Sequence, residues 1–153
     1  RVEVFDLLDG SGDWTPELPA PSELRCTTDR ADGSLPELPT DVRQLVDADA
    51  PARLGIDTPH GPVVLPARWE GADRFGVSAA ALAQVRADLP GAGCATFDDS
   101  ASRRPDRKRG VMLRGHLDLV EVDGAHASVA IRTERITAWD GFSASTSDVD
   151  DAP

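Results

Sequence analysis

The sequence is poor in several residue types, and each shortage narrows the range of functions. Its two cysteines, Cys26 and Cys94, form no CxxC pair and match no zinc-binding spacing, which argues against a disulfide framework and a zinc fold. Two scattered thiols in an acidic chain predict a reduced, cytoplasmic protein. No apolar run has the length of a membrane span and no signal-peptide pattern opens the chain, so we expect no membrane partner.

Positive charge is also scarce. Lysine and arginine together number 16 against 27 acidic residues, which gives a formal net charge of −11. Because nucleic-acid binding depends on cations that neutralise phosphates, we expect no nucleic-acid partner. The single lysine, Lys108, lies in a basic run at 103–109. This run is interpreted either as a phosphate clamp or as a solvated loop balanced by acidic neighbours.

Motifs that identify common catalytic sites are absent. The chain has no Walker loop and no GxGxxG, GxSxG or HExxH sequence. His116 and Asp118 stand two residues apart on a predicted strand and could reach one metal ion, but two ligands are too few for a metal site. We therefore expect no metal and interpret this face as solvated or interfacial.

The most regular pattern in the chain runs from Gly110 to Val122. Its apolar and polar residues alternate strictly, which predicts a strand buried on one face. Gly115 falls on the apolar side, where another backbone often comes close. After Leu119 the alternation changes phase, which predicts a bulge. The apolar set is Val111, Leu113, Leu117 and Leu119, and the polar set is Arg114, His116 and Asp118.

The remaining segments predict short strands and two helices in a single domain. The domain is expected to have an extended, proline-rich arm at 1–39, a barrel at 40–142 and an acidic flexible tail at 143–153. Pro66 places its strand at an edge or a split of the sheet. Many short strands with one inserted helix predict a small closed or split barrel. One expected helix begins near Thr40, and the other begins at Ser78–Ala79 and runs to Leu89. The further expected strands span 52–57, 62–70, 74–78, 93–98, 127–132 and 136–142.

Four stretches together carry a resemblance to a known family. They are the strand 62–66, the strand 75–78 with a helix directly after it, the stretch 109–115 and the late Trp139. From about residue 52 to 142 the chain resembles the pyridoxamine 5′-phosphate oxidase-like family, the flavin-binding split barrels. The resemblance implies a mainly β, six-stranded split barrel with a few helices, which forms a homodimer. It also implies FMN, or a deazaflavin, in the cleft between protomers.

The resemblance further implies which residues bind the cofactor. Ser78 would bind the phosphate, although it also has the sequence position of a helix N-cap. Gln84 stands where the family has a basic residue, and its neutral amide lacks the charge-assisted part of a bond to phosphate. Lys108 and Arg109 could supply that charge from the loop. The full implied set is Val64, Leu65, Arg68, Ser78, Gln84, Lys108, Arg109 and Trp139.

The resemblance implies a dimer as well, through the polar face of the central strand. Arg114, His116 and Asp118 would lie at a two-fold interface. Two functions follow. One is a flavin- or deazaflavin-dependent oxidoreductase acting on an unidentified small molecule, with no catalytic residue assigned. The other is a cofactor-free binding or interaction module that has kept the barrel and lost the flavin, as Gln84 and the absence of an obvious acid or base indicate.

Overall fold

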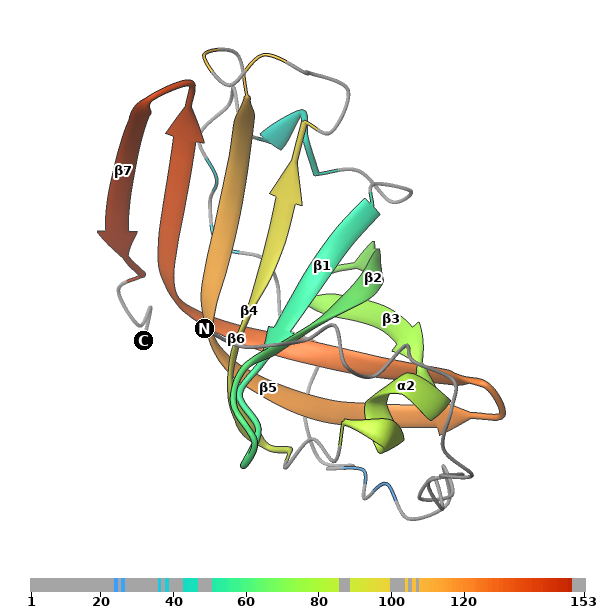
Figure 1. Cartoon of the computed structure of the whole chain (residues 1–153). Helices are drawn as coiled ribbons and strands as arrows, with labels where there is room; N and C mark the ends of the chain where they lie inside the picture. The colour runs from blue at the N-terminus through green and yellow to red at the C-terminus, as the bar shows by residue number, and fades with distance from the viewer. Residues whose placement is uncertain are drawn as a thin grey trace, which may run out of the picture.

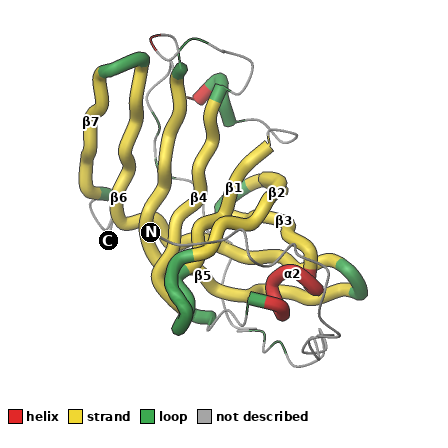
Figure 2. The backbone as a smooth tube through the Cα atoms, viewed as in Figure 1, coloured by secondary structure: helices red, strands yellow, loops and turns green. Residues whose placement is uncertain are grey.

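The computed structural model describes residues 24, 26, 36, 38, 43–46, 51–85, 89–99, 104, 106 and 108–149. Seven strands among these residues form one antiparallel sheet with the order β3-β2-β1-β4-β5-β6-β7. β3 also pairs with β6, which closes six strands into a barrel and leaves β7 outside it (Figures 1 and 2). The predicted mainly β, six-stranded split barrel is confirmed. The elements are β1 Pro51–Ile56, β2 Val63–Gly71, β3 Arg74–Ser78, α2 Ala79–Gln84, β4 Gly91–Asp98, β5 Arg109–Asp123, β6 His126–Asp140 and β7 Ser143–Asp148.

β5 and β6 are the two longest strands and curve around the barrel (Figure 1). Their pairing has two register shifts, one between Leu119 and Glu121 and one between Arg114 and Gly115. The first confirms the bulge predicted after Leu119. The second leaves Glu134 of β6 as the extra residue, because Arg114 pairs with Arg135 and Gly115 with Thr133. Bulges increase local twist and let a long strand bend.

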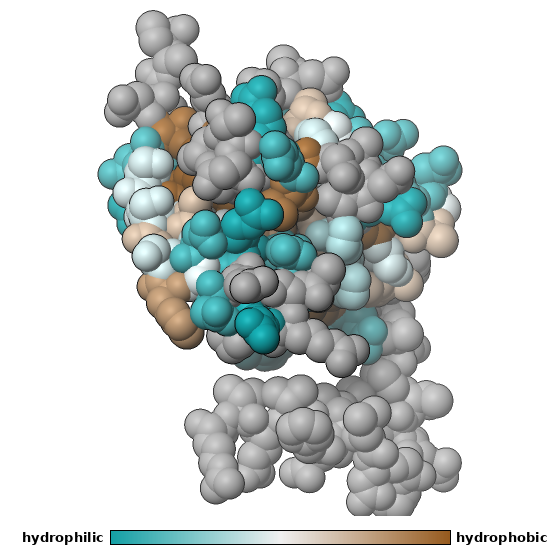
Figure 3. Space-filling view, turned by 90° about the horizontal axis from the view of Figure 1, so that it is seen from above, coloured by the Kyte–Doolittle hydropathy of each residue, from teal (hydrophilic) through white to brown (hydrophobic). Residues whose placement is uncertain are grey.

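The inner faces of the strands form the hydrophobic core. Phe75 and Phe97 are fully buried with ring centroids 5.7 Å apart, and Leu54, Leu113 and Leu117 are also fully buried. Burying a side chain of this size stabilises the fold by about 1.5–3 kcal/mol. The alternation predicted for the central strand is confirmed, since its apolar set is buried. Seen from above, hydrophobic residues are visible between hydrophilic ones on the described surface (Figure 3).

The predicted β1–β2 hairpin and the helix after β3 are present, with differences at the helix end. Gly61 has a φ of 109°, as its turn position requires. Pro66 pairs only with β1, because the β2–β3 ladder begins at Arg68. α2 ends at Gln84 with Val85 as its C-cap, whereas the expected helix runs to Leu89. Most of the expected arm and of the first helix lies outside the described residues. No described helix is long and apolar enough to cross a membrane.

Two expectations about the C-terminal third were wrong. The separate strands at 127–132 and 136–142 are one strand, β6, because the bulge at Glu134 interrupts the alternation without ending the strand. Residues 143–148, expected in a flexible tail, form β7 and pair with Arg135–Asp140. All six β7 side chains are exposed. The strand is therefore held by backbone pairing and by exposed side-chain bonds to β6, such as that of Arg135 to Asp148, and not by burial of its side chains.

Candidate functional site

An open groove of about 620 Å³ crosses the outer face of the sheet from β2 to β7. One row of register-paired residues spans it, with one residue from each of six strands. Because paired residues on one face have neighbouring side chains, this row forms a continuous surface. A volume of this size is in the range of small-molecule sites. The row is Val64, Gly55, Cys94, Arg114, Arg135 and Asp148.

Glycines make the middle of this surface low. At Gly55 a Cβ atom would come within 2.7 Å of the Cys94 Sγ, so the missing side chain lets the thiol lie beside the β1 backbone. Gly93 and Gly115 pair with each other one position further along β4 and β5. A Cβ atom on Gly115 would collide with the Arg132 carbonyl, which confirms the close approach of backbones predicted there. The strands can therefore lie close together below the groove.

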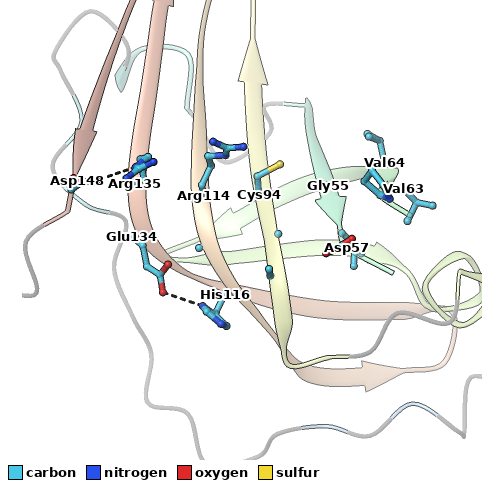
Figure 4. Close-up of a pocket in the computed structure, with 15 residues that line it drawn as sticks. Gly55, Asp57, Val63, Val64, Cys94, Arg114, His116, Glu134, Arg135 and Asp148 are labelled. Atoms are coloured by element: carbon cyan, nitrogen blue, oxygen red, sulfur yellow. Dashed lines mark hydrogen bonds and ion pairs between the residues drawn. The ribbon is translucent and has the colours of Figure 1, made fainter. Parts of the chain in front are cut away.

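Two polar pairs border the groove on β5, β6 and β7 (Figure 4). Arg135 Nε donates to Asp148 Oδ1 at 2.7 Å, and His116 Nδ1 lies 3.0 Å from Glu134 Oε1. Arg114 lies on β5 between Arg135 and Cys94, and its guanidinium points toward Cys94 (Figure 4). Its side chain is exposed, and no described residue forms a hydrogen bond or ion pair with it.

The opposite wall of the groove is mainly apolar. Val63 and Val64 of β2 and Pro62 form it, with Asp57 at its β1 end. Val64 is 64% exposed and is one of two large hydrophobic side chains exposed in the described structure. A wall of this kind beside one guanidinium suits a ligand with an apolar body and a polar end.

A second polar cluster lies on the outer face of β2, β3 and β6. Glu70 accepts a hydrogen bond from Ser128 Oγ at 2.9 Å, and its other oxygen lies 2.8 Å from His126 Nε2. Gly76 makes room for this cluster, since a Cβ atom there would come within 2.5 Å of both Glu70 and His126. Sequence analysis missed these residues, because Glu70 is brought over Gly76 by a register shift in β2.

The structure brings some predicted cofactor residues near this second cluster. Arg68 pairs in register with Gly76, and Ser78 follows two residues later on the same strand. Both are exposed. Ser78 Oγ accepts from the Ala81 N–H at 3.3 Å, so it is the N-cap of α2. Gln84 is exposed at the other end of the helix. Leu65 points into the core and offers only its backbone.

The other predicted cofactor residues lie elsewhere. Ser78 pairs with His126 at the start of β6, whereas Arg109 pairs with Asp140 at its end. Lys108 and Arg109 therefore lie at the opposite end of the barrel from α2 (Figure 1). Within one chain they do not supply the charge that Gln84 lacks. Trp139 packs over Gly110 at this same end.

Of the predicted interface residues, two line the groove. Arg114 and His116 do so together with Val64 from the cofactor set. Asp118 is half-buried and pairs with Ala130, away from the groove lining. The groove also contains residues that the sequence did not single out, above all Gly55, Cys94 and Glu134.

The groove suits a flavin ring better than the region around Arg68 and Ser78 suits a flavin phosphate. The groove has a low surface at Gly55 and an exposed apolar side chain at Val64. Arg68 lies on the same face of β2 as Val64, about 13 Å along the strand, and offers a cation with Ser78 beside it. The Glu70 carboxylate lies over Gly76 next to this position, and its negative charge repels a phosphate.

Comparison with known proteins supports the fold. No family model and no curated protein matches this sequence. A structure from Clostridium acetobutylicum, of a protein related to general stress protein 26 of B. subtilis in the pyridoxinephosphate oxidase family, has a TM-score of 0.53. Its sequence is 14% identical, and the match covers 71% of this chain and 92% of that one.

A second solved chain has a TM-score of 0.56 and 18% identity, covering 69% of this chain and 89% of that one. A heme-binding protein from Mycobacterium smegmatis has a TM-score of 0.47 and 15% identity over 66% of this chain and 53% of that one. The first likeness shows that this barrel has the fold of a pyridoxinephosphate oxidase family protein, as the sequence resemblance implied.

Proposed function

We propose that this protein is a dimeric flavin-binding oxidoreductase that acts on a small molecule. The observation that carries the proposal is the outer groove, which joins Val64 of the implied cofactor set to Arg114 and His116 on a barrel with this fold. FMN is the proposed cofactor and a deazaflavin the alternative. When bound, the flavin supplies the redox chemistry, while the protein holds it and orients the substrate.

The proposed dimer uses the polar face of β5. Arg114 and His116 are exposed beside the groove, so a partner placed here would face the ligand site. A small domain buries only part of its surface and gains stability by association. We expect a dimer in sedimentation velocity at micromolar concentration, and a monomer there would contradict this interface. The two cysteines are free thiols, which supports a cytoplasmic location as part of the proposal.

Flavin binding is tested by titration. We expect protein to quench FMN fluorescence at tens of micromolar, and Arg68→Gln to weaken binding because the phosphate loses a cation. Arg53→Gln is the matched control, since Arg53 is already paired with Asp98 at 2.9 Å. Protein that binds neither FMN nor a deazaflavin at this concentration would contradict the proposal.

A cofactor-free binding module is the second candidate, and Glu70 favours it. Its carboxylate lies beside the position proposed for the phosphate, and the neutral Gln84 does not offset it. If a weakened flavin site persists, Glu70→Gln and Gln84→Lys should each raise FMN affinity by removing or balancing negative charge. If neither variant binds more FMN than wild type, the binding module is the better description.

A further inference from the structure

Three basic side chains line the groove, and they differ in their partners. Arg135 is paired with Asp148, and His116 is paired with Glu134. Arg114 has no hydrogen-bond or ion-pair partner among the described residues. Its guanidinium is therefore the group in the groove that is available to bind an anion.

The position of Arg114 restricts the ligand. Cys94 and Gly55 extend from it along the register row toward Val64, and the surface there is low because Gly55 has no side chain. A guanidinium is a planar fork that binds a carboxylate or phosphate through two parallel hydrogen bonds. An anion on this fork leaves the rest of a ligand lying over the strip from Cys94 to Val64.

We propose that the groove is a binding site for a small organic anion. Its carboxylate or phosphate is held by Arg114, and its apolar body lies on Gly55, Cys94 and Val64. This assignment goes beyond the proposed flavin chemistry and does not depend on it. It also names a small molecule, and not a carboxylate of a second copy, as the partner of Arg114.

The acidic residues around the groove define where the anion can lie. Asp148 is paired with the Arg135 guanidinium at 2.7 Å, and the Glu134 carboxylate lies 3.0 Å from the His116 ring. Asp57, in contrast, is exposed at the β1 end of the groove, and its side chain forms no hydrogen bond or ion pair with another described residue. An anionic group is thus favoured at the Arg114 end and disfavoured at the Asp57 end.

The test adds three small probes of similar shape, one at a time, to the full chain. Binding is measured in solution from the shifts of the backbone amide NMR signals. Benzoate carries a carboxylate, phenyl phosphate carries a phosphate, and benzylamine carries a cation. We expect benzoate or phenyl phosphate to shift the amide signals of Gly55, Cys94 and Arg114, and benzylamine to leave them in place. Which anion binds more tightly tells whether the natural ligand is a carboxylate or a phosphate.

Two arginine variants make the test specific to the guanidinium. Arg114→Gln should weaken binding of the anionic probe at least tenfold, because a charge-assisted bidentate contact is lost. Arg132→Gln is the matched control, since it removes the same charge from an exposed β6 residue outside the groove lining, and it should change affinity less than threefold. Bound probe should also protect Cys94 from iodoacetamide, with Cys26 as the internal reference.

Three results would overturn the inference. The first is that wild type binds neither benzoate nor phenyl phosphate. The second is that Arg114→Gln binds the anionic probe as tightly as wild type does. The third is that wild type binds benzylamine more tightly than either anion. A loss of dimer in Arg114→Gln without any anion binding to wild type would assign the guanidinium to a second copy. Because no probe contains a flavin, these results are independent of the FMN titration.

Discussion

Two regions of the outer surface each contain a glutamate that sits at a register shift and contacts a histidine, but the two pairs have different surroundings. On β2 and on β6 a glutamate occupies a register shift, Glu70 in one and Glu134 in the other. Glu70 reaches across β3 to His126 of β6 at 2.8 Å, and Glu134 reaches His116 of the neighbouring β5 at 3.0 Å. A bulge redirects a side chain, and here it turns a carboxylate sideways along the sheet.

The surroundings of the two pairs differ. The Glu70 side chain is 30% exposed, also binds Ser128, and lies against Gly76. The Glu134 side chain is 57% exposed and borders the groove beside Arg114. The first pair fills a space on the barrel wall, whereas the second leaves polar groups open to a ligand. The neighbours of a Glu–His pair, and not the pair itself, therefore indicate whether it can take part in binding.

The largest loss of stability is expected from Gly115→Ala, which places a methyl group where two backbones meet beneath the groove. The new Cβ atom would collide with the Arg132 carbonyl, and a backbone atom cannot rotate away. We expect a loss of about 3 kcal/mol in the free energy of unfolding, measured by urea denaturation. Gly124→Asn is the control, because a Cβ atom there meets nothing within 4 Å and its φ of 56° lies in the left-handed region that asparagine tolerates. Equal, small losses in both variants would contradict the close strand approach.

Gly76→Ala is the corresponding change in the other region, and its effect should be smaller. There the new methyl group meets the ends of two movable side chains, Glu70 and His126. We expect a loss of about 1–2 kcal/mol. In a Glu70→Ala background the same change should cost less, since one obstacle is gone. If the two losses add without interaction in urea melts, the Glu70 side chain does not lie over Gly76.

The smallest effect on stability is expected from Glu134→Gln. Both partners of its pair are about half exposed, and such surface pairs contribute little, so the loss should be under about 0.5 kcal/mol. Glu70→Gln should cost about 1 kcal/mol, because it also weakens the bond to the buried Ser128. Thermal melts of the two variants side by side measure the difference, and the reverse order would contradict the comparison.

Much of the barrel could be predicted because alternation and turn residues are local signals. The central strand, its bulge after Leu119, the turn at Gly61 and the start of the helix at Ser78 all come from patterns within a few residues. β6 was divided in two because the bulge at Glu134 breaks the alternation, and β7 was missed because its polar side chains carry no pattern of burial.

The groove could be predicted only in part. Arg114 and His116 were singled out from the polar face of one strand, and Val64 from a family resemblance, but nothing local says that they share a surface. That depends on register across six strands, which is set by turns and bulges far apart in the sequence. Cys94 and Gly55 enter the site through this register alone.

The change of neighbour along β6 divides its amide protons into two populations. Its first five residues are paired with β5 on one side and β3 on the other, inside the closed barrel, and Ala127 and Val129 are fully buried there. Its last six residues are paired with β7, an outer strand without a buried side chain. Hydrogen exchange in the first part requires the barrel to open as a whole, whereas β7 can detach by a local fluctuation. Amide protons in the first part of β6 should therefore exchange more slowly than those bonded to β7, and the bulge at Glu134 lies between the two parts.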